Sequence, residues 1–392
     1  MIKKFIYGLG IKKLLLVILL IAFCVPNLSA GTLFSFNIRP YRIVTLLLFI
    51  SLFLKKEISF IPSKKIFIFF IYMLLLSLVT SFFFGYDRLI FDYIFAYIIV
   101  LVVYNYGKDI KYLEWLELFQ YAALFLITLS LTSIVLQKDI LIDFINNPIH
   151  QHPAYISIFP GGLNLDATWI ALFSLFFINK PIRGYIYLLF SIIISMILSS
   201  RVGLIIDIMA LSVIFINHLM NIEKNKRKII VIVFTILFAI AGYLLYYFNI
   251  AGNILSRFTE IGTDGGSQGR LNIWKNIIPN FLKNPFGYGV GNGMQIIKDN
   301  TKMWFGEDNV HNIYFQMLLD TGFIGLGYFI YLIISFIKKN RKILLKVAFV
   351  VFFVFYFIIG FIQFKGAEIF VYYVLGVYLI ISKQGEIYEK KD

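Results

Sequence analysis

The chain has 392 residues, of which 60% are hydrophobic, 15% are charged and one is cysteine. This hydrophobic content is well above the roughly half expected of a soluble globular domain, and it excludes a soluble enzyme. The net charge of +15 would suggest a nucleic-acid partner in a soluble protein, but in a membrane protein it reports topology. We therefore expect no nucleic-acid partner. The single cysteine excludes an intramolecular disulfide and any CxxC metal or redox site.

Apolar runs separated by polar or basic breaks predict an all-α, polytopic integral membrane protein, because a membrane-spanning helix needs about 20 mostly apolar residues. We place about twelve transmembrane helices at residues 14–33, 41–54, 66–84, 89–104, 115–136, 165–178, 185–199, 202–219, 229–248, 312–337, 343–362 and 368–381. The short segments 41–54 and 165–178 are expected to tilt, bend or re-enter, or to have shifted boundaries. The chain then divides into residues 1–248 with helices one to nine, an outer loop at 249–311, and residues 312–392 with helices ten to twelve and a cytoplasmic tail.

The distribution of basic residues predicts which connections face the cytoplasm, where Lys and Arg are enriched. With a cytoplasmic N-terminus, the inner segments hold 24 of the 36 Lys and Arg, and the outer segments hold 12. Both termini are then cytoplasmic. An alternative concerns the first segment, whose basic start, apolar run and small-residue site at 28–30 also fit a cleaved signal peptide, although Pro26 and Asn27 suit a helix end equally well. Cleavage would leave the remaining topology unchanged.

Two outer connections, 137–164 and 249–311, are long enough to bind or catalyse something. The first is rich in Pro and Gly and is read as an irregular loop. Its His150 and His152 could ligate a metal, but no acidic or thiol partner lies nearby in sequence, so a solvated loop is the better interpretation.

The second loop contains a Gly-rich stretch at 262–269 and then the sequence RLNIWKNIIPNFLK at 270–283, whose apolar residues follow helical spacing along one side. Trp274 favours the membrane interface, so we expect an amphipathic helix on the outer membrane surface, bent by Pro279. The following GYGVGNG at 287–293 resembles a dinucleotide fingerprint, but it lacks the strand and helix of a soluble βαβ unit. Close backbone packing explains these glycines better.

Three cationic or titratable groups are predicted on the same outer side, each at a helix end: Arg201, Arg270 and His311. A lone arginine there can snorkel to phospholipid headgroups, and a lone histidine can form a local hydrogen bond. Together, however, Arg201 and Arg270 could clamp a pyrophosphate, since guanidinium groups form bidentate bonds to phosphate and helix N-termini add N–H donors. His311 could accept a proton from an acceptor hydroxyl, because histidine titrates near neutral pH.

A metal site is the competing interpretation of the region before the tenth helix. Glu307, Asp308 and His311 could supply ligands. Two adjacent carboxylates commonly serve as a solvated charge in the first helical turn, so we predict no metal and no cofactor.

The segments SSRVG at 199–203, GRLNIWKNIIPNFLKNPFGYGVGNG at 269–293 and HNIYFQMLLDTGFIGLGYFIY at 311–331 resemble, in the same order, the signature blocks of the O-antigen polymerase and O-antigen ligase superfamily. The resemblance implies a membrane glycosyltransferase with a C-type glycosyltransferase architecture in the bacterial inner membrane. Its active site would face the periplasm. The family's two arginines carry over onto Arg201 and Arg270 as substrate-binding residues, and its histidine onto His311 as the catalytic residue.

The resemblance further implies a partner, an oligosaccharide linked to undecaprenyl pyrophosphate, and transfer of the glycan to a sugar hydroxyl with inversion and without metal. Membrane lipids surround the enzyme, and a chain-length regulator is a further candidate partner. The leading hypothesis is a surface-polysaccharide polymerase that uses the non-reducing sugar of another carrier-linked repeat unit as acceptor. The nearest alternative is a ligase that attaches the glycan to lipid A core, as in lipopolysaccharide. A flippase or transporter for lipid-linked sugar is a minor alternative, disfavoured because no internal repeat is evident.

Acidic residues inside predicted spans mark functional sites without fixing their role. Asp320, which lies near Gly322, Gly325 and Gly327 in the tenth helix, could orient His311 or an acceptor. Helix packing around a break is the simpler interpretation. Asp207 is expected to be buried in the eighth helix.

Overall fold

The computed structural model describes residues 10–26, 32–33, 36–37, 39–56, 58–137, 139, 157–158, 162–247, 258–259, 262–263, 265–302 and 309–385. His150, His152, Glu307 and Asp308, together with both chain ends, lie outside these residues. The metal sites considered for these side chains, signal-peptide cleavage and the side on which the termini lie therefore stay predictions.

The described chain is helical apart from one small hairpin, which confirms the all-α prediction. In that hairpin β1 (Thr32–Leu33) pairs antiparallel with β2 (Phe36–Asn37). The helices are α2 (Ile11–Cys24), α3 (Pro40–Leu54), α4 (Lys64–Phe84), α5 (Leu89–Gly107), α6 (Tyr112–Leu136), α8 (Leu163–Phe173) with the 3-10 helix η1 (Ser174–Phe177), α9 (Pro181–Ile197), α10 (Arg201–Met220), α11 (Lys224–Tyr247), α13 (Gly265–Lys275), α14 (Ile277–Lys283), α15 (Asn292–Thr301), α16 (Ile313–Asn340), α17 (Ala348–Ile359) and α18 (Ile369–Lys383).

Each of the twelve predicted spans overlaps one of these helices, but helix length supports fewer complete crossings. Within the described residues, α4, α5, α6, α10 and α16 are long and apolar enough to cross a membrane, whereas α3, α8 with η1, α9, α17 and α18 are apolar but shorter. The chain is thus a multi-pass membrane protein, and the number twelve stays a prediction. The first predicted span, 14–33, is wrong at its end: α2 stops at Cys24 because Pro26 disfavours helical geometry at Val25.

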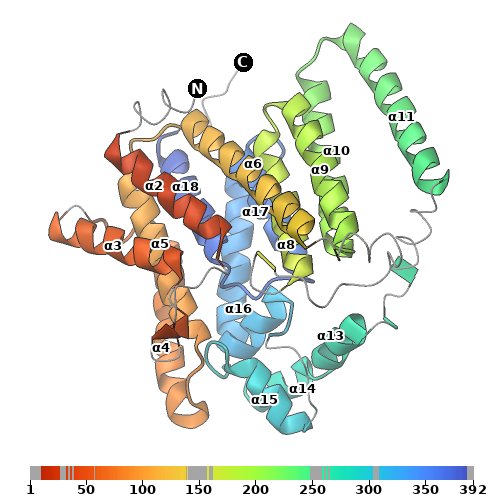
Figure 1. Ribbon diagram of the computed structural model, residues 1–392. Coiled ribbons are helices and arrows are strands. Elements are labelled where there is room, and N and C mark those ends of the chain that lie inside the picture. The colour runs from red at the N-terminus through yellow and green to blue at the C-terminus, as the bar shows by residue number, and fades with distance from the viewer. Residues whose placement is uncertain are drawn as a thin grey trace.

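Small residues let the helices of the bundle approach closely. A Cβ placed on Gly203 of α10 would lie 2.7 Å from atoms of Ala167 on α8 and Ser195 on α9. Gly376 of α18 meets Val103 of α5 in the same way, at 2.8 Å. Helix association in membranes depends on such close approach, because lipid supplies no hydrophobic driving force between helices. In Figure 1, α11 stands apart from this bundle, and α13, α14 and α15 lie together at its lower edge.

Asp207 on α10 is fully buried, as predicted. Its carboxylate accepts hydrogen bonds from the hydroxyls of Ser191 at 2.6 Å and Ser195 at 2.8 Å, both on α9. The acid therefore ties α10 to α9.

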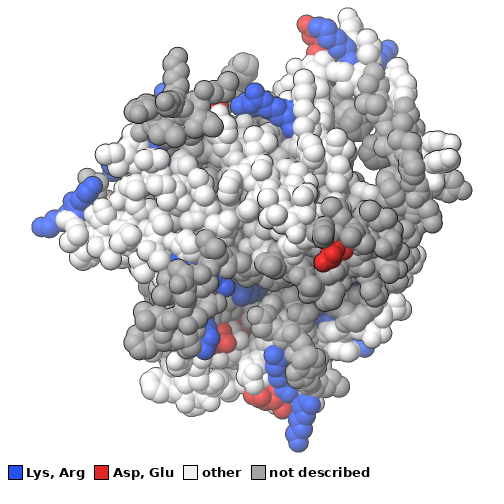
Figure 2. Space-filling view, viewed as in Figure 1, with Lys and Arg blue, Asp and Glu red and all other residues white. Residues whose placement is uncertain are grey.

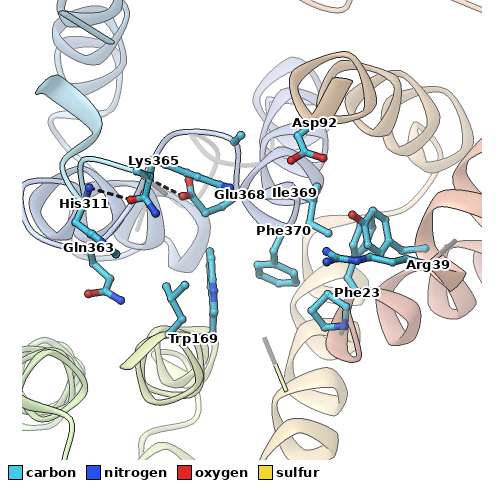
Figure 3. A pocket seen from close by; sticks show the side chains of 15 residues that line it. Phe23, Arg39, Asp92, Trp169, His311, Gln363, Lys365, Glu368, Ile369 and Phe370 are labelled. Carbon is cyan, nitrogen blue, oxygen red and sulfur yellow. Dashed lines mark hydrogen bonds between the residues drawn. The ribbon is translucent and has the colours of Figure 1, made fainter. Parts of the chain in front are cut away.

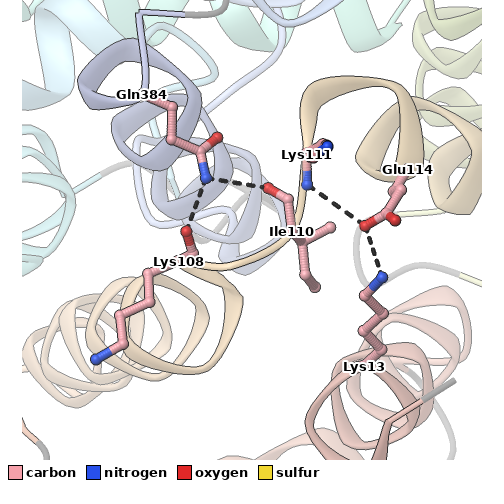
Figure 4. Close-up of polar contacts among 6 residues, drawn as sticks. All are labelled: Lys13, Lys108, Ile110, Lys111, Glu114 and Gln384. Carbon is pink, nitrogen blue, oxygen red and sulfur yellow. Dashed lines mark hydrogen bonds and ion pairs between the residues drawn. The ribbon is translucent and has the colours of Figure 1, made fainter.

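Connections predicted to be cytoplasmic meet one another. Figure 4 shows Lys13 paired with Glu114 at 2.7 Å, and Gln384 donating to the carbonyls of Lys108 and Ile110. The Lys383 ammonium likewise donates to the Tyr104 hydroxyl. Away from such ends, Figure 2 shows a broad uncharged area over the upper left of the view. This separation of charge suits helices embedded in lipid.

The tenth predicted helix is interrupted, as the glycines suggested. Gly322 has φ +67° and ψ −169°, a conformation outside the helical region, so α16 is two helices joined at this residue. The carbonyls freed by the break accept hydrogen bonds from Tyr288 N, Gly289 N and the Tyr72 hydroxyl, at 2.8–2.9 Å. The freed N–H of Phe323 donates to the Pro285 carbonyl. The protein thus replaces the hydrogen bonds that lipid could not supply.

Candidate active site

His311 lies two residues before the first residue of α16 and has φ +54°, a left-handed conformation that is uncommon for a residue with a side chain. Such strain costs roughly 1–3 kcal/mol and persists only where the surroundings enforce it. Here the enforcing contacts come from the next two residues. The Asn312 side chain caps α16 by accepting from Tyr314 N and Phe315 N, and it donates to the Phe361 carbonyl. Ile313 N donates to the Gly360 carbonyl.

A cavity of about 170 Å³ opens beside His311. Figure 3 shows His311 and Gln363 at one side of it, Arg39 and Phe23 at the other, and Glu368, Phe370 and Trp169 between them. The lining also includes Asp92 and Lys365. Basic, acidic and aromatic side chains therefore surround the imidazole, a combination that suits a charged and sugar-containing ligand.

Sequence reasoning did not nominate Arg39, Lys365, Glu368, Asp92 or Trp169 as site residues. The predicted topology did indicate two of them, because it placed the basic residues Arg39 and Lys365 on the same outer side as His311. Nothing in their spacing indicated a shared cavity, since they belong to connections far apart in the chain. Glu368 is held in place by accepting hydrogen bonds from Lys365 N at 2.7 Å and Gly366 N at 3.0 Å.

The predicted amphipathic helix exists, but its limits and its break differ from the prediction. Helix α13 begins at Gly265, within the predicted flexible stretch, so Arg270 lies inside the helix and not at its N-terminus. The break falls at Asn276, not at Pro279. Proline lacks an N–H and its ring clashes with the carbonyl four residues earlier, at Lys275, so the new helix α14 starts after that residue. Arg270 therefore does not lie beside the unsatisfied N–H groups of a helix N-terminus, which the prediction expected to help it bind phosphate.

The apolar residues of α13 and α14 do not all face one way. Ile273 and Ile277 are buried against α15 and the first half of α16, in a cluster with Tyr288, Met294, Ile297, Val310, Leu318 and Leu319. Leu271, Ile278 and Leu282 are exposed. The helices therefore pack on the protein with one side and present a second apolar side outward, where the prediction had a single face toward lipid.

Both predicted arginines contact elements next to the His311 cavity. Arg270 Nη1 donates to the Ile362 carbonyl at 3.1 Å, and the neighbouring residue Gln363 lines the cavity. Arg201 is the first residue of α10, and its Nη2 donates to Ser267 Oγ on α13 at 3.3 Å. The structure therefore brings both arginines to one helix. Neither of them lines the cavity itself.

Helix α13 is also joined directly to the histidine segment. Trp274 Nε1 donates to the Val310 carbonyl at 2.9 Å, one residue before His311. Through Ser267, Arg270 and Trp274, α13 thus links Arg201, the 360–363 segment and the residue preceding His311.

The glycine run packs closely on α16 and α4, as expected for glycines that serve backbone packing. A Cβ on Gly287, which has φ +95°, would lie 2.6 Å from backbone atoms of Asp320 and Gly322. A Cβ on Gly289 would overlap the Thr80 hydroxyl. The last two residues of the run, Asn292 and Gly293, begin α15, a helix that sequence reasoning did not predict.

Asp320 is buried and its carboxylate holds the glycine run in place. It accepts hydrogen bonds from Gly291 N at 2.9 Å, Gly293 N at 3.3 Å and Gln316 Nε2 at 2.8 Å. Gln316 Oε1 in turn accepts from Val310 N. Among the described residues, Gln316 is therefore the side chain that connects Asp320 with the segment of His311.

No group of three His, Cys, Asp or Glu residues within the described parts of the chain is arranged to hold a metal ion. The acidic pair considered as co-ligands of His311 lies outside those parts. Metal independence stays a prediction.

Residues 186–330 match the protein family described as O-antigen ligase. The matched segment contains Arg201, Arg270, His311 and Asp320. The match confirms the resemblance to the O-antigen polymerase and ligase superfamily. No curated protein matches the chain.

Proposed function

We propose that the protein is a membrane glycosyltransferase that moves a glycan from a polyprenyl diphosphate carrier to a sugar hydroxyl, since residues 186–330 match the O-antigen ligase family. The observation that carries this proposal is the position of His311, which lines a cavity together with Arg39, Lys365 and Glu368. Strained backbone at a residue facing such a cavity is typical of active sites.

In the proposed reaction the acceptor hydroxyl oxygen bonds to the anomeric carbon of the donor glycan while the bond from that carbon to the diphosphate oxygen breaks. His311 takes the hydroxyl proton, and the diphosphate leaves with the electron pair of the broken bond. Arg201 and Arg270 neutralise the charge that develops on the leaving diphosphate.

The carrier we propose is undecaprenyl pyrophosphate, and the first candidate acceptor is the non-reducing sugar of another carrier-linked repeat unit, which makes the protein a polymerase. The second candidate acceptor is lipid A core. It is favoured by one observation, that the matching family is described as O-antigen ligase. We place the reaction at the outer side of the inner membrane, because the basic residues follow the positive-inside distribution. Metal independence and a chain-length regulator belong to the same proposal.

The test is incubation of purified full-length protein with undecaprenyl pyrophosphate carrying one repeat unit, followed by sizing of the products. We expect a ladder, and we expect His311→Ala to lower its rate by about 100-fold or more, because a general base contributes about 10²–10⁴-fold. The matched control is His218→Ala, since His218 contacts Tyr185 on the neighbouring helix and does not line the cavity. Full activity of His311→Ala would refute the assigned base.

The arginines are tested in the same assay. Arg270→Gln should lower the rate by about 10²-fold or more, as expected for loss of one donor to developing charge. Lys275→Gln removes an exposed cation from the same helix and should leave the rate within a few fold. Product that forms only when lipid A core is added would identify a ligase, and absence of product with both acceptors would contradict glycosyl transfer.

A further inference from the structure

A second cavity, of about 450 Å³, lies between α4, α16, α17 and α18. Its walls are mostly aliphatic and aromatic, and they include Phe329, Leu332, Phe336, Leu375 and Leu379. The lining residues of α16 from Phe329 to Lys339 cover about 15 Å of helix at 1.5 Å per residue. The cavity is thus an elongated apolar space parallel to the second half of α16.

One end of this cavity is basic. Lys64, Lys65 and Lys339 belong to its lining, and the lining contains no Asp or Glu. Lys65 and Lys339 line this end of the cavity together, and like charges held close to each other are unfavourable unless an anion lies between them. The ion pairs in which both partners belong to the described residues lie elsewhere, at Lys13, Arg42 and Lys226.

The positions of these two lysines are fixed by neutral partners. Lys65 Nζ donates to Ser335 Oγ at 2.8 Å and lies 4.8 Å from the centre of the Tyr331 ring. Lys339 Nζ donates to Ser382 Oγ. An ammonium group has three N–H donors, so each of these contacts leaves the group able to bind an anion as well.

The other end of the cavity is lined by uncharged residues. Ile313, Met317 and Gly366 lie there, and the Tyr372 hydroxyl donates to the Gly366 carbonyl at 2.8 Å. The loop around Gly366 separates this end from the His311 cavity, which Lys365 lines on the other side. The anionic group of a molecule bound at Lys65 and Lys339 would therefore lie at one end of α16, and His311 lies at the opposite end.

We infer that this cavity is a binding site for an anionic glycerophospholipid of the inner leaflet, with its phosphate at Lys65 and Lys339 and an acyl chain along α16 and α18. The argument is charge complementarity at one end and an apolar space of acyl-chain shape behind it. The carrier-linked donor is disfavoured as occupant because its diphosphate must lie near His311. The exclusion of the carrier-linked donor rests on the proposed function, whereas the test uses no enzymatic readout, so a failure of this inference is distinguishable from a failure of the proposed function.

The test titrates phosphatidylglycerol onto the detergent-purified full-length protein and counts bound lipid by native mass spectrometry. Each lysine near an anionic lipid contributes about 1 kcal/mol, so the double variant Lys65→Gln/Lys339→Gln should bind phosphatidylglycerol about 25-fold more weakly than the natural protein. Phosphatidylcholine should bind the two proteins equally. The control is Lys55→Gln/Lys56→Gln, which removes two exposed lysines near the end of α3 that do not line the cavity.

A second variant tests the acyl-chain position without changing charge. Leu332→Trp/Leu375→Trp fills the cavity, so it should lose the bound phosphatidylglycerol while both lysines remain. Two results would overturn the inference: unchanged phosphatidylglycerol affinity in either double variant, or recovery of a polyprenyl phosphate and not a phospholipid from the protein as purified.

Discussion

At the scale of single residues, Asp320 illustrates how a buried acid serves a site that it does not touch. Its carboxylate accepts from two backbone N–H groups of the glycine run and from Gln316, which holds Val310, the residue before His311. A buried carboxylate is costly unless it is fully hydrogen-bonded. These contacts supply the bonds, and they make Asp320 a positioning residue.

We predict that Asp320→Ala destabilises the protein by about 3 kcal/mol or more, because it leaves several buried donors without an acceptor and each costs about 1–3 kcal/mol. Asp320→Asn should destabilise less, since one oxygen remains. Thermal unfolding of the detergent-purified variants measures the effect. Asp299→Asn on α15 changes an exposed carboxylate and should stay within about 0.5 kcal/mol of the natural protein. Equal behaviour of Asp320→Ala and Asp299→Asn would contradict this role.

Sequence reasoning could find some site residues and not others for a physical reason. Hydrophobic patterning places His311 and Arg201 at helix starts, and in the structure Arg201 is the first residue of α10 while His311 precedes the N-cap Asn312 of α16. Arg39 and Lys365 lie in connections whose approach to His311 depends on the packing of several helices. Patterning assigns such residues to a side of the membrane but not to a neighbour.

At the scale of secondary-structure elements, the break in α16 depends on one of three nearby glycines. Gly322 alone among them has positive φ, and a Cβ on it would lie 2.4 Å from the Phe286 carbonyl carbon and the Pro285 oxygen. Gly327 has no atom within 4 Å of such a Cβ. The same residue type therefore has different roles at positions five residues apart.

We predict that Gly322→Ala destabilises the protein by about 3 kcal/mol or more, because it adds backbone strain and a clash with the 285–286 segment. Gly327→Ala is the matched control, and it should be neutral or stabilise the protein by up to about 1 kcal/mol, as alanine does in a helix. Denaturation midpoints of the two variants distinguish these outcomes. Similar losses in both variants would show that the break is not held by the 285–286 contact.

The elements that patterning predicted best are the long apolar helices, and it failed where glycine and proline decide the geometry. The spans at 66–84 and 89–104 correspond closely to α4 and α5. Glycines at 265, 266 and 269 lowered the expectation of helix, yet α13 includes them because Ile273 and Trp274 pack on α15, α16 and Val310. Tertiary packing overrode local propensity there.

At the scale of the whole molecule, connections predicted to face the same side of the membrane contact one another, and the two sets make separate contacts. Lys13, Glu114 and Gln384 take part in one set of contacts. Arg42 and Asp92 are paired at 2.8 Å near the His311 cavity in the other. The residues assigned to the two sides of the membrane thus take part in separate contacts, and the sides themselves stay predictions.

We predict that a cysteine at position 299 is accessible from outside the cell and one at position 55 is not. The background is Cys24→Ala, which removes the natural cysteine, a buried thiol in α2. Asp299→Cys and Lys55→Cys each add one exposed thiol. A membrane-impermeant maleimide applied to intact cells whose outer membrane has been permeabilised should label the first and not the second, and lysed cells should give label on both. The reverse pattern would invert the topology.

The capped break in α16 also constrains the order in which the protein can be made. Its three carbonyls are capped by Tyr72, Tyr288 and Gly289, all of which precede α16 in the chain. During synthesis these partners are translated before the broken helix leaves the ribosome. The hydrogen-bond donors for the break are therefore already present when α16 enters the membrane. If they were translated later, each unsatisfied carbonyl in hydrocarbon would cost several kcal/mol until its donor arrived. Moving the 285–289 segment behind α16 by circular permutation would remove this advantage during co-translational insertion.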